Sequence, residues 1–257
     1  MARSKTSNRK RVSKRSRASA APRFEALEPR LLLATWSGTL AGDTTFGTTP
    51  GEVEEITGDL TVPVGVTLNI LPGTVVKLRP NTDLLVRGTV TGPGTAASPI
   101  TITSVKDDSV GGDTNGDGAA TSPAAGNWGG IQLLAATANV DLDHTTIRFG
   151  GNLSSPVRQT AGTLNLDSVE VSASSQAAVF IGNGDATLVG TQIRNVTGFG
   201  LDINDTSGGT GTITLTDTAI ENASSGPYKI HPSINLTATG TTSTGSGRDN
   251  AIFVDLL

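Results

Sequence analysis

Apolar side chains recur along the second half of the chain in an eight-residue pattern, V-x-L-x-x-T-x-I, which is apolar at its first, third and eighth positions. Five copies follow one another, and they begin at Val140, Leu164, Ala186, Ile213 and Ile234. The last copy has lost its apolar eighth residue. A period in the low twenties with short, β-branched segments is typical of a solenoid. The pattern therefore predicts stacked coils rather than one globular core.

A second apolar pair follows the eighth position at fixed distances of 8 and 10 residues in three copies. The pairs are Val179 and Ile181, Leu201 and Ile203, and Tyr228 and Ile230. We therefore expect each coil to carry two short strands joined by a turn, with the variable length elsewhere in the coil. The stretches 60–62, 66–70, 75–78, 84–86 and 99–103 alternate in the same way between Gly and Pro turn signals, after a polar lead-in at 36–51.

Stacking of the coils places like residues above like residues, which predicts ladders of side chains. The first, third and eighth positions form aliphatic ladders inside. Position 6 forms a threonine ladder whose hydroxyls bond along the stack, with the residues Thr145, Val169, Thr191, Thr218 and Thr239. Asn195 and Asn222 predict a short asparagine ladder at a turn, because Asn tolerates the left-handed conformation.

Composition agrees with a solenoid of one domain. The chain has 257 residues, of which 35% are hydrophobic and 4% aromatic, too few for a large globular core. Gly and Pro are spread along the chain without a three-residue period, as expected for many tight turns. The absence of cysteine excludes disulfides and thiolate-bound metals.

Charge divides the chain into a basic leader and an acidic body. Residues 1–30 hold ten Lys and Arg and two acids, whereas the rest holds nine Lys and Arg and 21 acids, a net charge of −12. Residues 1–23 have almost no large apolar side chain, so we expect them to be disordered. The acidic body would repel nucleic acid, so only the leader is a candidate for binding it, and we expect no nucleic-acid partner.

The end of the leader, residues 24–34, reads F-E-A-L-E-P-R-L-L-L-A and resembles the LEPR-XLL motif. The matching residues are Leu27, Glu28, Pro29, Arg30, Leu32 and Leu33. This motif stands near the start of many large bacterial surface or exported proteins, behind a basic, Ser-rich stretch. The resemblance implies secretion or placement on the cell surface, and no activity. The alternatives are a chance match in a short amphipathic helix, which Pro29 would interrupt, and an ordinary export signal, although the apolar run at 31–34 is shorter than the ~7–15 residues of such a signal. No run approaches the ~20 apolar residues of a transmembrane span.

A second resemblance covers residues 60–131, which include G-V-T-L-N-I-L-P-G-T-V-V-K-L, S-P-I-T-I-T-S and G-N-W-G-G-I. These runs are similar to the opening coils of bacterial right-handed parallel β-helix proteins of the pectin-lyase-like class, and the repeat from Val140 extends them to the C-terminus. We therefore expect an all-β, single-stranded, right-handed parallel β-helix at 36–257, with an acidic loop inserted at about 105–127. The basic leader with its motif occupies 1–35.

The best candidate for chemistry is the acidic loop, which reads D-D-S-V-G-G-D-T-N-G-D-G from Asp107. Asp113, Asn115 and Asp117 place oxygens at alternate positions before glycine, a spacing that directs them at one hard cation, usually Ca²⁺. Ala124 stands where an EF-hand has its bidentate glutamate, so Asp107 or Asp108 would have to supply a further ligand. Two interpretations stay open: a Ca²⁺ site or, more conservatively, a solvated acidic loop.

Enzymes of the pectin-lyase-like class make carboxylates a second candidate. Asp141, Asp143 and Asp167 occupy outward positions of adjacent coils, beside Asn165, and are the candidate catalytic residues. The following coils have no acid at positions 2 and 4, so we favour a solvated strand face.

The chain's two histidines, His144 and His231, stand 87 residues apart and predict no zinc site. We expect Trp128 to seal the core rather than to stack on sugar.

These features favour a non-catalytic, exported or cell-surface β-helix that is structural or adhesin-like. Its partners would be envelope or extracellular polysaccharides or other surface proteins. The alternative is a polysaccharide lyase or glycoside hydrolase of the same fold. The last coil ends at Leu257 without a visible polar cap. We therefore expect either a fragment of a longer surface protein or a C-terminal face that docks on another module.

Overall fold

The computed structural model describes residues 33–49, 52–204, 211–231, 234–247 and 252–254. Across these residues the regular structure consists of strands alone, all of whose ladders are parallel. This confirms the all-β parallel solenoid. None of the described residues belongs to a helix with the length and hydrophobicity needed to cross a membrane. The expected disordered leader, and its motif up to Leu32, lie outside the described residues.

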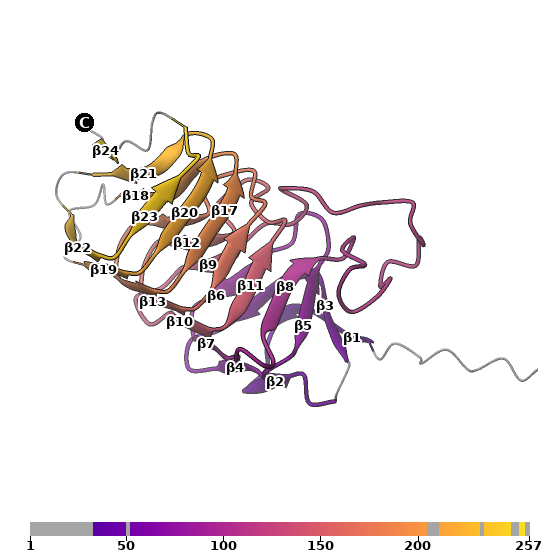
Figure 1. Ribbon diagram of the computed structural model, residues 1–257. Coiled ribbons are helices and arrows are strands. Elements are labelled where there is room, and N and C mark those ends of the chain that lie inside the picture. Colours follow the sequence, from indigo (N-terminus) through magenta and orange to yellow (C-terminus); the bar gives the residue numbers. More distant parts are fainter. Residues whose placement is uncertain (1–32, 50–51, 205–210, 232–233, 248–251, 255–257) are drawn as a thin grey trace, which may run out of the picture. The chain divides into compact units, whose positions relative to one another are not determined.

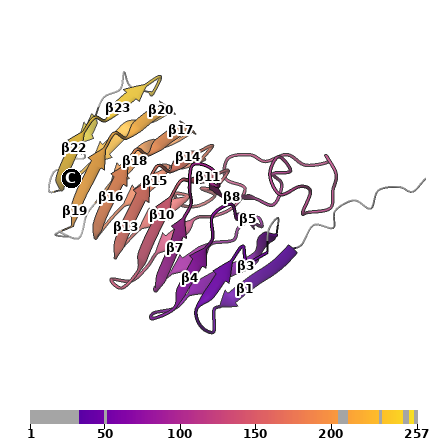
Figure 2. The same cartoon turned by 60° about the horizontal axis from the view of Figure 1, so that its bottom comes forward.

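Each coil contributes one strand to each of three faces (Figure 1). The first face is an eight-stranded sheet, which Figure 2 shows as a row from β4 to β22. Its strands are β2 (Thr44–Phe46), β4 (Thr67–Ile70), β7 (Thr89–Pro93), β10 (Asn139–Asp143), β13 (Thr163–Asp167), β16 (Asp185–Val189), β19 (Thr212–Thr216) and β22 (Asn235–Thr239). The second face holds β5 (Val75–Leu78), β8 (Ile100–Ser104), β11 (Thr145–Arg148), β14 (Glu170–Ser172), β17 (Gln192–Val196), β20 (Ala219–Ala223) and β23 (Thr242–Thr244). The third face holds β6 (Leu84–Val86), β9 (Ile131–Leu133), β12 (Val157–Gln159), β15 (Val179–Ile181), β18 (Phe199–Ile203), β21 (Gly226–Ile230) and β24 (Ile252–Val254).

The second and third faces are joined into one sheet by the long strand β3 (Val53–Val62). Its first residues pair with β5 and its last residues pair with β6. β1 (Leu33–Thr39) pairs with β3 on the opposite side and slips register between Trp36 and Gly38. β2 and most of β1 thus lie in the segment 36–51, which the sequence indicated only as a polar lead-in. β1 begins at Leu33, within the stretch 1–35 assigned to the leader.

The expectation of two strands per coil is wrong, because the eight-residue pattern turns a corner. Positions 1–4 belong to the first face and positions 6–8 belong to the second, as β10 and β11 show. Position 5 between them adopts a left-handed conformation in every copy, at His144, Ser168, Gly190, Asp217 and Gly240. Gly240 is position 5 of the fifth copy because that copy begins at Leu236. A single left-handed residue is therefore the whole turn between these faces.

The expected start of the fifth copy is also wrong. Ile213 pairs with Leu236, not with Ile234, so the copy begins two residues later. Its sixth position is consequently Thr241 rather than Thr239. A shift of two residues preserves the alternation of inward and outward side chains, which is why the pattern did not reveal it.

The expected aliphatic ladders form the core. Val140, Leu164, Ala186 and Ile213 pair in register at position 1, and all are buried. Positions 3 and 8 are buried in the same four coils, with the residues Leu142, Leu166, Leu188, Leu215, Ile147, Val171, Ile193 and Ile220. Burial of each large aliphatic side chain contributes roughly 1.5–3 kcal/mol, so stacking itself stabilises the fold.

Of the two expected polar ladders, the threonine ladder differs from the prediction and the asparagine ladder agrees with it. The buried hydroxyls of Thr191 and Thr218 donate to backbone carbonyls of the preceding coil, at Leu166 and Leu188, rather than to one another. Val169 interrupts that row. The asparagine ladder is confirmed: Asn222 Nδ2 donates to Asn195 Oδ1 at 3.0 Å, and both residues have positive φ angles of 56° and 55°.

The first coil buries an acid. Glu54 is 2% exposed beneath Trp36 and Phe46, whose ring centroids lie 4.9 Å apart. Its carboxylate accepts hydrogen bonds from Trp36 Nε1 and from the Gly47 amide, each at 2.7 Å. Burial raises the pKa of Glu54, although both hydrogen bonds oppose the rise.

Candidate metal centre and candidate catalytic surface

The acidic loop connects β8 to β9 and runs out from the stack beside β8 and β5 (Figure 1). Backbone hydrogen bonds fix both of its ends: Val105 N donates to Leu78 O, and Gly129 N donates to Thr82 O. The insertion is therefore held on the outside of the second face, where it covers β5.

Within the loop, Asp113 organises the turn. Its Oδ1 accepts the Gly116 amide at 2.8 Å and its Oδ2 accepts the Gly118 amide at 2.8 Å. Both glycines have positive φ angles of 70° and 67°. The D-T-N-G-D-G spacing thus folds the backbone tightly around one carboxylate and brings its neighbours together.

The structure brings the three expected residues Asp113, Asn115 and Asp117 together and places Asp108, rather than Asp107, beside them. Carboxylate oxygens of Asp108, Asp113 and Asp117 lie within 4.8 Å of one another. Asn115 joins them through its Nδ2, which donates to Asp117 Oδ2 at 2.9 Å. Asp108 is therefore the additional acid of the group, whereas Asp107 points elsewhere.

Three oxygens of this group have no hydrogen-bond donor among the described residues. They are Asp108 Oδ1, Asn115 Oδ1 and Asp117 Oδ1, and each atom is buried. A buried oxygen left without a partner costs about 1–3 kcal/mol, so three in one loop are unfavourable unless something else satisfies them. A hard cation would do so: Ca²⁺ takes 6–8 oxygen ligands, and backbone carbonyls and water would complete the set.

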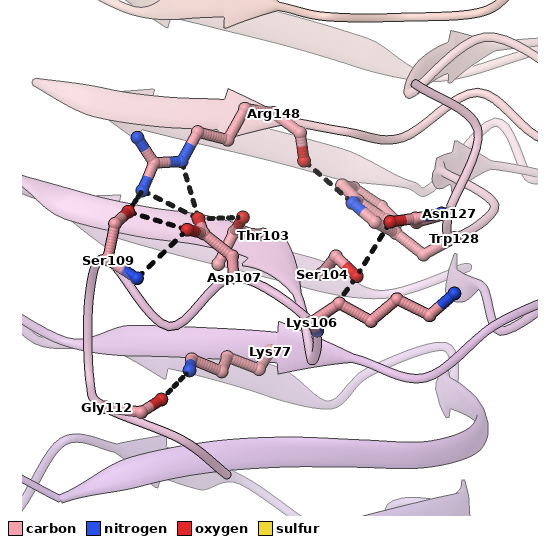
Figure 3. A network of polar contacts seen from close by, with 10 residues as sticks. All are labelled: Lys77, Thr103, Ser104, Lys106, Asp107, Ser109, Gly112, Asn127, Trp128 and Arg148. Atoms are coloured by element: carbon pink, nitrogen blue, oxygen red, sulfur yellow. Dashed lines mark hydrogen bonds and ion pairs between the residues drawn. The ribbon is translucent and has the colours of Figure 1, made fainter. Parts of the chain in front are cut away.

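Asp107 anchors the base of the loop instead (Figure 3). It is 1% exposed, and its Oδ2 accepts hydrogen bonds from Thr103 Oγ1 at 2.7 Å and Arg148 Nε at 2.8 Å. Its Oδ1 accepts the Ser109 hydroxyl at 2.6 Å. Burial alone would raise the pKa of Asp107, but these bonds and the Arg148 charge together lower it.

Lys77 is a buried cation beneath the loop, and no pattern in the sequence indicated its burial. It is 0% exposed on the outer side of β5, and its Nζ donates to Gly112 O at 2.5 Å. Burial lowers the pKa of Lys77, against the charges of Asp107, Asp108, Asp113 and Glu55. Its burial depends on a loop that follows some thirty residues later, so no local pattern could have indicated it.

The candidate catalytic carboxylates meet on the first face. Asp143 pairs directly with Asp167, and both lie with Asp141 around a depression of about 250 Å³. Its other lining residues are Thr91, Gly92 and Pro93. No Lys or Arg is among them, and the row continues with Thr187 and Val189 in the next coil.

Two of these acids form hydrogen bonds with the residue that follows them in the chain. Asp143 Oδ1 lies 2.5 Å from His144 Nδ1, and Asp167 Oδ1 accepts the Ser168 hydroxyl at 2.9 Å. His144 and Ser168 are the corner residues of adjacent coils and line a neighbouring depression of about 340 Å³, together with Glu170. The acids are thus brought together, and among the described residues no Lys or Arg lines their depression.

The expectation for Trp128 is confirmed by its burial. Trp128 is 0% exposed, and its Nε1 donates to Arg148 O at 2.8 Å, so it seals the core as expected (Figure 3). On the outer side of the second face, Arg194 lies 3.8 Å from Glu170 and 3.3 Å from Glu221, and all three side chains are partly exposed. The outer side of the second face is therefore an ordinary solvated strand face where the loop does not cover it.

Comparisons of the chain with protein-family models, with curated proteins and with solved structures found no match.

Proposed function

We propose that this chain is a non-catalytic structural module of an exported or cell-surface protein, with one Ca²⁺ ion bound in the 105–127 loop as part of its fold. The observation that carries the metal proposal is the convergence of Asp108, Asp113 and Asp117, with Asn115 hydrogen-bonded to Asp117. Among the described residues, one buried oxygen each of Asp108, Asn115 and Asp117 has no hydrogen-bond donor. Export and surface placement are supported by the likeness of residues 24–34 to the LEPR-XLL motif.

The non-catalytic part of the proposal is supported by the first face. Its outward residues are mostly Thr, Asn and Asp in register over many coils, as in the row Asp141, Asn165, Thr187, Thr214 and Thr237. A row of short polar side chains suits contact with a polysaccharide or another surface protein. The acids of this face occupy three neighbouring coils, with Asp141 and Asp143 in β10, Asp167 in β13 and Asp185 in β16.

Thermal unfolding in CaCl₂ and in EDTA tests the metal proposal. At 100 times Kd the ion would stabilise the fold by about 2.7 kcal/mol, a rise in melting temperature of roughly 5–10 °C for a chain of this size. Asp117→Asn should abolish the rise, whereas Asp141→Asn on the first face should retain it. Equal melting temperatures in CaCl₂ and EDTA would refute the proposed ion.

The alternative function, a polysaccharide lyase or glycoside hydrolase, is favoured by one observation, the meeting of Asp141, Asp143 and Asp167 around a depression. Incubation with pectin, alginate and neutral glucans, followed by assays for unsaturated products and reducing ends, separates the two functions. We expect binding without turnover. Turnover that disappears in the double variant Asp141→Ala, Asp167→Ala would establish the enzyme instead.

A further inference from the structure

A row of charged side chains runs up the outer side of the second face, and the 105–127 loop covers only part of it. Glu55 pairs with Lys77 and Lys77 pairs with Thr103, and all three residues are 0% exposed. Further along the same row, the side chains of Arg194 and Glu221 are 39% and 42% exposed. The loop contacts two members of this row, Lys77 through Gly112 O and Thr103 through Asp107 Oδ2, whereas Arg79 donates to Glu55.

The contacts that hold the loop down lie in residues 107–112 (Figure 3). Lys77 donates to Gly112 O, and Arg148 Nη2 donates to Ser109 Oγ at 2.8 Å. Gly111 has a φ of 64°, and a Cβ there would lie 2.8 Å from Val53 Cγ2, so the backbone itself rests on the strands. This segment is the inner surface of the loop.

Residues of the proposed ion site lie on both sides of the Ser109 and Gly112 contacts in the sequence. Asp108 precedes the contacts of Ser109 and Gly112, and Asn115 and Asp117 follow them. An ion shared by both sides closes residues 108–117 into a ring around the contact segment. Without the ion, the carboxylates of Asp108, Asp113 and Asp117 face one another at short distance and repel.

We propose that the 105–127 loop is a cover that bound Ca²⁺ latches over Lys77 and Thr103, and that loss of the ion opens it. The latch rests on the proposed Ca²⁺ site and adds to it a conformational consequence. Lys77 becomes accessible when the ion leaves, and its contact with Gly112 breaks.

The amine of Lys77 reports opening directly. The purified full chain is treated with an amine-reactive acetyl ester in CaCl₂ or in EDTA, and the labelling rate of each lysine is measured by mass spectrometry. Lys229, on the third face, is the internal reference, because it does not contact the loop. At 100 times Kd, an ion that binds only the closed form lowers the open population about 100-fold, and the Lys77 rate should fall by up to that factor. The Lys229 rate should not change.

Calorimetric titration of the same sample with CaCl₂ separates the two proposals. Binding of Ca²⁺ with equal Lys77 rates in CaCl₂ and EDTA would overturn the latch and leave the ion in place. Absence of binding would overturn both. In Asp117→Asn, Lys77 should label at the fast rate in either buffer, while Asp141→Asn should behave as the wild type; circular dichroism checks that both variants fold.

Discussion

The buried pair of Asp107 and Arg148 offers a quantitative test of how the loop is anchored. In Arg148→Met, Asp107 Oδ2 loses contacts at 2.8 Å from Nε and 2.6 Å from Nη2, but keeps the hydrogen bond from Thr103. Removing one partner of a buried pair costs about 3–5 kcal/mol, because a charge remains buried and unpaired. The Arg148 side chain is 27% exposed, so we expect about 3 kcal/mol, the lower end of that range.

Arg158→Met is the matched control, since it removes the same charge from an outward position. The Arg158 guanidinium lies 4.3 Å from the centroid of the Phe180 ring, and no carboxylate pairs with it in the part of the chain that the structure describes. A cation–π contact at such a site contributes about 0.5–1 kcal/mol. The two variants should therefore differ by about 2 kcal/mol or more.

Urea unfolding followed by tryptophan fluorescence measures this difference. Trp36 and Trp128, the chain's two tryptophans, both lie in the core of the early coils, so the signal reports the region that the loop covers. With a slope of about 1–3 kcal/mol per molar urea, Arg148→Met should lower the midpoint by roughly 1–3 M, and Arg158→Met by much less. Equal shifts in the two variants would refute the assignment of Asp107 and Arg148 as the anchor.

Three further predictions concern the coils. Burial raises the pKa of Glu54, so the stability that this carboxyl contributes is present below its ordinary pKa near 4.5 and is lost as pH rises through the pKa of the folded state. The unfolding free energy of the wild type relative to Glu54→Gln should therefore decrease from pH 4 to pH 7. Asn222→Ala should lower the unfolding free energy in urea by about 1–2 kcal/mol, because alanine is strained in the left-handed conformation and cannot make the hydrogen bond to Asn195. Asn222→Gly should lower it distinctly less, and equal losses would contradict a contribution from the left-handed backbone. Thr191→Val should cost less than about 1.5 kcal/mol by thermal melting, since Val169 occupies the same position one coil earlier, and a larger loss would show that the hydroxyl is essential.

The coil repeat and its inward ladders could be predicted from the sequence because every coil presents the same environment. The third strand could not, because the corner between the first two faces is one left-handed residue. His144, Ser168 and Asp217 share that conformation with Gly190, and they carry no common turn signal. A turn of several residues would have been easier to predict, because it carries Gly, Pro, Asn or Asp at defined positions of the sequence.

The candidate site was predictable to the extent that its chemistry is local. Asp113, Asn115 and Asp117 stand within five residues, so their spacing alone indicated a cation. The choice of Asp108 over Asp107 depends on Arg148, which lies in a later coil. The covered row depends likewise on a loop that returns over earlier strands, and such contacts leave no periodic signature.

The most direct test of the proposed Ca²⁺ site is a search for an ion in crystals grown with Tb³⁺, an anomalous scatterer that replaces Ca²⁺ at oxygen sites. We predict one strong anomalous peak within bonding distance of Asp108 Oδ1, Asn115 Oδ1 and Asp117 Oδ1, and its loss in Asp117→Asn. An ordered loop without a peak there, or a peak unaffected by the substitution, would contradict the proposed calcium-dependent fold.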